Sequence, residues 1–122
     1  MDYSHMLAYQ QALFADNVAQ LILEIGRQGY HCTFGEAWRS PEQAEIYAKQ
    51  GKGVRNSLHC QRLAIDLNLF TNDFHYITDY KEYQQFGDFW EGISDDNRWG
   101  GYFVLKYKGK IVDSNHFERK VK

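Results

Sequence analysis

The chain has 122 residues, of which 43% are hydrophobic and 16% aromatic, and its formal net charge is -2. This length is typical of one domain, and the aromatic content favours a packed core over disorder. The 14 basic and 16 acidic side chains are interspersed, so they form no basic patch for nucleic acid or for an anionic membrane surface. We therefore predict a single domain, residues 1–122, that recognises its partner locally.

The N-terminal residues lack the basic start, the apolar run and the small-residue cleavage site of a secretory signal. No stretch approaches the ~20 apolar residues that span a membrane. We expect a product made in the cytoplasm, without stable membrane insertion. Cys32 and Cys60 are too few for a disulfide scaffold, and we expect both to be reduced, with a single bridge between them as the alternative.

Hydrophobic periodicity predicts the elements of the first half. Residues 5–28 repeat apolar side chains at close to 3.6 positions, which indicates an amphipathic helix. Residues 30–38 mix β-branched and aromatic side chains and predict a strand that can hold a bulge. Ser40 and Pro41 are typical of a helix N-terminus, so we predict a second helix at 41–50.

The second half continues with a loop at 51–57, a strand at 63–70, a third helix at 80–93 and a polar turn at 94–101. In 102–113 a Lys-Gly pair divides two apolar runs, which predicts a β-hairpin, and His-Phe-Glu at 116–118 closes the domain. No internal repeat or linker interrupts this order. The elements together predict an α+β fold, in which a small antiparallel sheet has flanking helices.

Two short motifs place metal-capable side chains beside apolar strand residues. The first holds His59 and Asp66, and the second holds Asp113 and His116. Side chains alternate between the faces of a strand, so separations of seven and three residues put each pair on opposite faces unless a turn intervenes. The polar residues between the members of each pair are suited to such turns.

Two neutral imidazoles and one carboxylate make a three-ligand set for Zn²⁺ that leaves one coordination position open, as in catalytic zinc sites. A nearby carboxylate that does not bind the metal can take a proton from the attacking water and deliver it to the leaving amine. Asp113 is the candidate for this role. Spacing alone gives equal weight to the alternative, in which His59 is a loop histidine, Asp66 a turn residue and His116 a strand histidine.

The segments SLHCQRLAIDL and DSNHFE, with WGGYF between them, resemble the signature of the zinc D-Ala-D-Ala carboxypeptidase and phage L-alanyl-D-glutamate endopeptidase family. That family has the lysostaphin and hedgehog-type fold. The resemblance extends from EAWRSPEQ to HFE. It implies that His59, Asp66 and His116 bind zinc and that Asp113 is the general base. It also implies that Arg39 polarises the scissile carbonyl or binds a substrate carboxylate.

Two features depart from the family pattern. Relatives usually have a glycine where Arg62 stands, so the turn after His59 is expected to follow another backbone path. Residues 104–112 also exceed the corresponding connection in compact relatives. Ser57 is a candidate for a hydrogen bond near the metal, with a plain turn serine as the alternative.

Other side chains carry less specific signals. Cys60 adjoins a ligand, but we expect it to be a packed small side chain. Glu118 either contacts His116 or lies on the solvent face. Three aromatic residues are expected in the core, with a peptide groove as the alternative: Trp99, Tyr102 and Tyr107. Three histidines lack partners in a motif and are expected to have no role in the site: His5, His31 and His75.

The resemblance implies a zinc metallopeptidase that hydrolyses an amide bond in the stem peptide of bacterial peptidoglycan, with L-Ala-D-Glu as the expected bond and a bacteriolytic phage endolysin as the expected setting. Such an enzyme is expected to be a monomer that stays in the host cytoplasm before lysis and then acts on the cell wall. The alternatives are a D-Ala-D-Ala carboxypeptidase or dipeptidase and a non-catalytic zinc-binding module or phage structural component. A nuclease that uses His59, Asn115 and His116 is disfavoured, because no basic patch follows a phosphate backbone.

Overall fold

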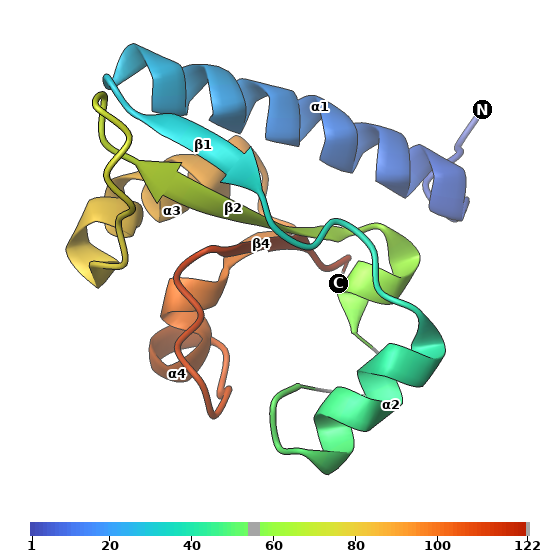
Figure 1. Cartoon of the computed structure of the whole chain (residues 1–122). Coiled ribbons are helices and arrows are strands. Elements are labelled where there is room, and N and C mark those ends of the chain that lie inside the picture. Colours follow the sequence, from blue (N-terminus) through green and yellow to red (C-terminus); the bar gives the residue numbers. More distant parts are fainter. Residues whose placement is uncertain (54–56, 122) are drawn as a thin grey trace.

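The computed structural model describes residues 1–53 and 57–121 and confirms the predicted α+β class (Figure 1). Its four-stranded antiparallel sheet has the order β1-β2-β4-β3, with β1 at His31–Phe34, β2 at Ala64–Phe70, β4 at His116–Arg119 and β3 at Asn97–Trp99. The helices are α1 (Leu7–Arg27), α2 (Pro41–Lys49), α3 (Tyr80–Ile93) and α4 (Phe103–Lys106), and two 3₁₀ turns are η1 (Leu58–Gln61) and η2 (Gly100–Tyr102).

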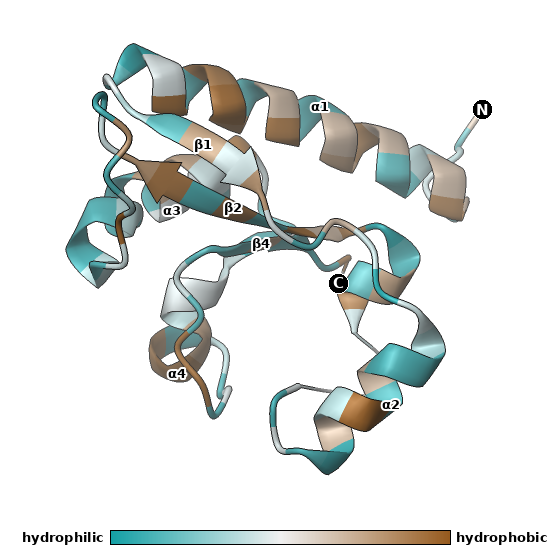
Figure 2. Ribbon diagram, in the orientation of Figure 1, coloured by the Kyte–Doolittle hydropathy of each residue, from teal (hydrophilic) through white to brown (hydrophobic). Residues whose placement is uncertain are grey.

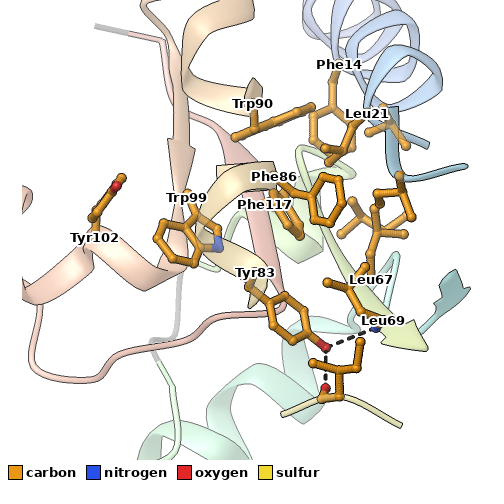
Figure 3. Close-up of a cluster of buried hydrophobic side chains, with 14 of the residues drawn as sticks. Phe14, Leu21, Leu67, Leu69, Tyr83, Phe86, Trp90, Trp99, Tyr102 and Phe117 are labelled. Atoms are coloured by element: carbon orange, nitrogen blue, oxygen red, sulfur yellow. Dashed lines mark hydrogen bonds between the residues drawn. The ribbon is translucent and has the colours of Figure 1, made fainter. Parts of the chain in front are cut away.

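Helices α1 and α3 cover one face of the sheet, and the hydrophobic core lies between them and the strands. The apolar stripe of α1 and alternate residues of β2 are brown in Figure 2. Ile65, Leu67 and Leu69 of β2 belong to this core. Figure 3 shows Leu67 and Leu69 on the same side of the sheet as the aromatic side chains of Phe86 and Phe117. Since residues alternate along a strand, the intervening side chains of β2 point to the other face.

Helices α2 and α3 begin at the predicted residues, α2 from its predicted cap and α3 from its apolar spacing. The hydroxyl oxygen of Ser40 accepts a hydrogen bond from the backbone nitrogen of Gln43 at 3.0 Å, and Pro41 is the first residue of α2. Helix α3 has the predicted bounds and is capped by Asp79, whose carboxylate accepts from Lys81 N at 3.1 Å. Local sequence therefore determines where these helices begin.

Gly87 has a packing role inside α3. A Cβ atom at this position would lie 2.1 Å from Cδ2 of Trp99. The missing side chain lets α3 lie directly on β3, and this contact offsets the low helix propensity of glycine. The phenol of Tyr83, one turn earlier, bonds the sheet to the following loop, because it accepts from Leu69 N and donates to Ile77 O, each at 3.0 Å (Figure 3).

The predicted hairpin at 102–113 is wrong. After β3 the chain turns through η2 and α4 and reaches β4 without a strand in the described residues between them. Gly100 and Gly101 permit this sharp turn, since a Cβ on Gly100 would lie 2.1 Å from the carbonyl oxygen of Asp113 and one on Gly101 would lie 2.2 Å from the Trp99 ring. On the side away from β2, β4 pairs with the three-residue β3, which lies in the segment 94–101 that we predicted as a turn.

Strand β1 is shorter than predicted. It ends at Phe34, although the next residues still pair with β2, because Gly35 N donates to Asp66 O at 2.8 Å and Asp66 N donates to Glu36 O at 2.9 Å. The predicted loop at 51–57 includes residues 54–56, which lie outside the described residues. Cys32 and Cys60 are both free thiols, as expected. None of the described helices is long and apolar enough to cross a membrane.

Candidate metal centre

His59, Asp66 and His116 meet on the face of the sheet opposite α1 and α3, which we call the site face. His59 comes from η1, Asp66 from the middle of β2 and His116 from the first position of β4. Asp66 and His116 are cross-strand partners, so their side chains leave the sheet side by side. The structure thus brings together the three residues that the sequence predicts as metal ligands.

The turn after His59 removes the conflict of strand parity. His59 lies before β2 rather than within it, and Ser57 caps η1 by accepting a hydrogen bond from His59 N at 3.2 Å. Arg62 ends η1 with a φ of 56°, which is the left-handed conformation that favours glycine. This arginine departs from the family pattern in residue type, yet its backbone conformation is one that a glycine adopts readily. Its guanidinium lies over the Trp38 ring at 5.2 Å.

The second turn brings Asp113 to the same place. His116 N donates to Asp113 O at 3.2 Å, and Leu67 N donates to Asn115 O at 2.8 Å, so the turn is tied to β2. The Asp113 carboxylate lies 3.9 Å from Nδ1 of His116. Asp113 therefore lies beside the cluster of His59, Asp66 and His116, but farther from His116 than Asp66 does.

The three converging atoms have the spacing of a tetrahedral metal site. His59 Nε2 lies 3.1 Å from His116 Nδ1, and Asp66 Oδ1 lies 3.3 Å from each of these nitrogens. Two zinc–ligand bonds of ~2.0–2.1 Å at a tetrahedral angle separate their ligand atoms by about 3.3 Å. The donor set of two imidazoles and a carboxylate is also one that Zn²⁺ takes in catalytic sites. The group could therefore hold a metal ion.

Glu118 holds the ring of His116. Its Oε1 accepts a hydrogen bond from His116 Nε2 at 2.8 Å, which leaves Nδ1 with a lone pair that points into the cluster. The other carboxylate oxygen of Glu118 bonds to Arg98 at 2.8–2.9 Å. Of the two positions that the sequence left open for Glu118, the structure shows the buried one beside His116.

His59 has a different environment at its second ring nitrogen. Nδ1 is buried and has no hydrogen-bond partner among the described residues. The nearest carboxylate oxygen, Oε1 of Glu36, lies 3.9 Å away and bonds to Nε of Arg39 at 2.5 Å. The Glu36 carboxylate thus lies between the histidine and the arginine.

Arg39 lies at the η1 end of the cluster and is well anchored. Its Nη1 donates to the Ser57 hydroxyl at 3.3 Å, and its guanidinium carbon lies 4.9 Å from the centre of the Tyr47 ring. Its backbone nitrogen donates to His59 O at 3.3 Å. These contacts place a positive charge next to the metal-capable residues.

The carboxylates of the site titrate differently. Burial raises the pKa of Asp113 above its ordinary value, and the nearby Asp66 carboxylate adds to this effect, although His116 opposes it. Burial also acts to raise the pKa of Asp66, but hydrogen bonds with His116 and His59 lower it to about 2. Asp66 is therefore the firmly ionised member, and Asp113 is the stronger base.

Sequence reasoning missed Glu36 and Arg98. Glu36 lies three residues before Arg39, a spacing that could have indicated an ion pair, whereas Arg98 is in the unpredicted strand β3. Cys60 points away from the cluster, with Sγ 3.8 Å from Ser40 O. The aromatic residues considered for a groove belong instead to the core or pack against it; these are Trp99, Tyr102 and Tyr107. His31 and His75 are exposed, as is His5.

The fold of this chain is that of a solved peptidase. No protein-family model and no curated protein sequence matches the chain. Among solved structures, it is similar to the crystal structure of the Serratia marcescens L-Ala D-Glu endopeptidase ChiX, with a TM-score of 0.66. The sequences are 18% identical, and the match covers 87% of this chain and 79% of that chain. The similarity establishes a shared fold.

Proposed function

We propose that this chain is a zinc-dependent peptidase that hydrolyses an amide bond in the stem peptide of bacterial peptidoglycan. The observation that carries the proposal is the convergence of His59, Asp66 and His116 at the ligand separations of a tetrahedral metal site, with an additional carboxylate beside them. The fold supports it, since the similar ChiX structure is described as an L-Ala D-Glu endopeptidase.

The residues in and around the cluster have different roles in the proposed hydrolysis. His59, Asp66 and His116 would hold a Zn²⁺ ion, which would supply a Lewis acid for the amide carbonyl and for the attacking water. Asp113 accepts a proton from the attacking water and transfers it to the nitrogen of the leaving amine. Arg39 faces the developing negative charge or binds a substrate carboxylate. Glu118 keeps Nδ1 of His116 directed at the cluster.

The bond that we propose is L-Ala-D-Glu, and the setting is a phage endolysin. A lysin of this kind is a monomer that is held in the host cytoplasm until the membrane is breached and then reaches the wall. The motif resemblance covers both activities, and the similarity to ChiX favours this bond over D-Ala-D-Ala.

Digestion of purified sacculi tests the proposal. Mass analysis of the soluble products should show peptides that begin with D-Glu, and the glycan strands should retain only L-Ala. A chelator should abolish this release, and added Zn²⁺ should restore it. Release of free D-Ala from pentapeptide stems would instead identify a carboxypeptidase, and the absence of any product with the zinc-loaded protein would favour a non-catalytic zinc-binding module.

A further inference from the structure

The site face continues past the metal-capable residues toward the end of β2. Beyond Asp66 it carries Asn68 and Phe70 of β2. Their cross-strand partners on β1 are Thr33 and His31, which share the same face. Arg39 lies at the opposite end of the site face, in an ion pair with Glu36. The charged residue of the 68–76 stretch is Asp73, whose carboxylate lies 3.7 Å from Nδ1 of His75 in the exposed turn after β2. One end of the site thus carries a guanidinium, and the other carries a carboxylate without a lysine or arginine.

Two asparagines form a pair at the start of the 68–76 stretch. Asn115 Nδ2 donates a hydrogen bond to Asn68 Oδ1 at 3.0 Å. The remaining polar atoms, Asn68 Nδ2 and Asn115 Oδ1, have no partner among the described residues and are not buried. The pair therefore offers one donor and one acceptor side by side, which complements the C=O and N–H of a secondary amide. A pocket of about 240 Å³ adjoins it, lined by Tyr76, Thr78, Tyr83, Ser114 and Asn115.

Four aromatic rings follow the asparagine pair, and we call them the aromatic platform: Phe70, Tyr76, His31 and Phe74. Phe70 and Tyr76 form a β-bridge, and their ring centroids are 5.4 Å apart. His31 and Phe74 stack at 4.3 Å with an interplanar angle of 7°. Tyr76 is 58% exposed and Phe74 is 65% exposed. Large aromatic residues gathered in this way on a surface mark binding sites.

The turn that presents Phe74 has a strained backbone. Phe74 has a φ of 64°, a conformation that is costly for a bulky side chain. Hydrogen bonds hold it there, because Phe74 N donates to Thr71 O at 2.9 Å and His75 N donates to the Thr71 hydroxyl at 3.0 Å. The strained conformation places the Phe74 ring at the surface, where it does not stabilise the hydrophobic core. This points to a role for the ring in binding.

We propose that the aromatic platform and the Asn68–Asn115 pair bind an N-acetylated sugar of the glycan strand next to the scissile amide. The C–H faces of a pyranose ring stack on the electron-rich faces of aromatic rings. The acetamido group of such a sugar is a secondary amide, so it matches the donor and acceptor that the asparagine pair leaves free. This inference rests on the proposed function and adds a glycan subsite to it.

Charge and length favour the glycan over the peptide at this end. The Asp73 carboxylate beside the platform repels the carboxylates of the stem, whereas the Arg39 guanidinium at the other end attracts them, so the uncharged sugar suits the platform better than the stem does. An alanyl unit and a lactyl group extend up to about 7 Å from the scissile bond to the sugar. Asn68 and Phe70 lie two and four residues beyond Asp66, or about 7 and 13 Å along the strand. A single sugar ring spans that interval.

Kinetics on two matched substrates test the subsite. N-acetylmuramyl-L-Ala-D-Glu contains the sugar, and lactyl-L-Ala-D-Glu is the same molecule without it. We expect a KM at least about fivefold lower for the substrate with the sugar, the worth of one good aromatic contact. Phe74→Gly should remove this preference with little change in kcat, and it should fold well because glycine suits the φ of 64°. Tyr76→Ala should act in the same direction.

Phe34→Ala is the matched control. Phe34 is as exposed as Phe74, at 65%, but it pairs with Leu67 and therefore points to the opposite face of the sheet. It should leave the preference unchanged. Equal KM values for the two substrates with the unaltered enzyme would overturn the glycan subsite while the peptidase activity stands.

Direct binding separates the subsite from the catalytic proposal. The tetramer of N-acetylglucosamine, titrated into the zinc-loaded protein, should shift the NMR signals of residues 68–76, and Phe74→Gly should weaken this binding at least about fivefold. If the tetramer binds and neither dipeptide is hydrolysed, the proposed function fails and the subsite stands. If the tetramer does not bind, or if a sugar-free stem peptide causes the same shifts, the glycan assignment is wrong.

Discussion

The two faces of strand β2 serve different purposes, although they alternate along seven residues. On the face toward α1 and α3, Leu67 is 0% exposed and Leu69 is 1% exposed. On the site face, Asp66 and Asn68 are partly open to solvent and bond to side chains rather than pack among apolar ones. One strand therefore fixes the core and the candidate site together, and neighbouring substitutions should separate stability from activity.

The largest expected effect concerns the metal ligands. His59→Ala and His116→Ala should each abolish stoichiometric zinc binding and peptidase activity, because two remaining ligands hold Zn²⁺ poorly. Elemental analysis of protein purified without added metal, together with the sacculus assay, measures both. The ligand assignment is wrong if both variants keep full zinc occupancy and full turnover.

Asp113→Ala should reduce turnover at least ~100-fold and leave zinc bound, since the carboxylate is proposed to move protons rather than to hold the metal. Single-turnover hydrolysis of a stem peptide and zinc analysis on the same sample provide the measurement. Ser114→Ala alters the neighbouring residue of the same turn and is a suitable control. A folded Asp113→Ala protein with near-normal hydrolysis would exclude the general-base role.

Leu67→Ala changes the opposite face of β2, one residue from Asp66. It should lower the free energy of unfolding by about 2–5 kcal/mol, because it opens a cavity in the core, while the folded fraction still binds zinc. Urea denaturation of the zinc-loaded protein measures the change. A selective loss of zinc without loss of stability would show that the two faces are not independent.

The smallest expected effect is that of Glu118→Gln. The amide oxygen can still accept from His116 Nε2, but the negative charge that supports the ligand is removed, so zinc affinity should fall about 10-fold or somewhat more. Competition with a chromogenic chelator measures the affinity. Glu45→Gln, in an exposed ion pair with Lys49 on α2, should not alter it.

Local signals in the sequence were enough for much of the fold. The capping residues Ser40 and Asp79 begin their helices with side-chain hydrogen bonds, and α3 has the bounds that its apolar spacing predicts. Strand β3 was not predicted because its three residues show no hydrophobic alternation and form a strand only by pairing with β4, which is distant in the sequence. The error in the predicted hairpin has a similar origin, since the apolar residues of 102–113 indicate strand pairing that the turn at Gly100 and Gly101 prevents.

The candidate site shows a similar division. The metal-capable residues lie in two recognisable motifs, so the sequence located them and also indicated that turns must reorient them. The partners that orient the ligands were harder to predict. Glu118 lies beside His116 because residues two apart on a strand share a face, but its burial, which decides between the two predicted positions, depends on the packing around β4. Glu36 comes within 3.9 Å of His59 only through the path of the chain after β1. Tertiary geometry therefore decides what local spacing leaves open.

The position of Asp113 depends on the absence of a side chain at Gly100. Asp113 N donates to Gly100 O at 3.1 Å, and a Cβ on Gly100 would come within 2.1 Å of the Asp113 carbonyl oxygen. Even alanine at position 100 would push the loop outward and carry the carboxylate away from His116. A directed-evolution experiment that randomises position 100 and selects for lysis should therefore recover glycine alone, whereas a selection for soluble expression should accept more residue types there.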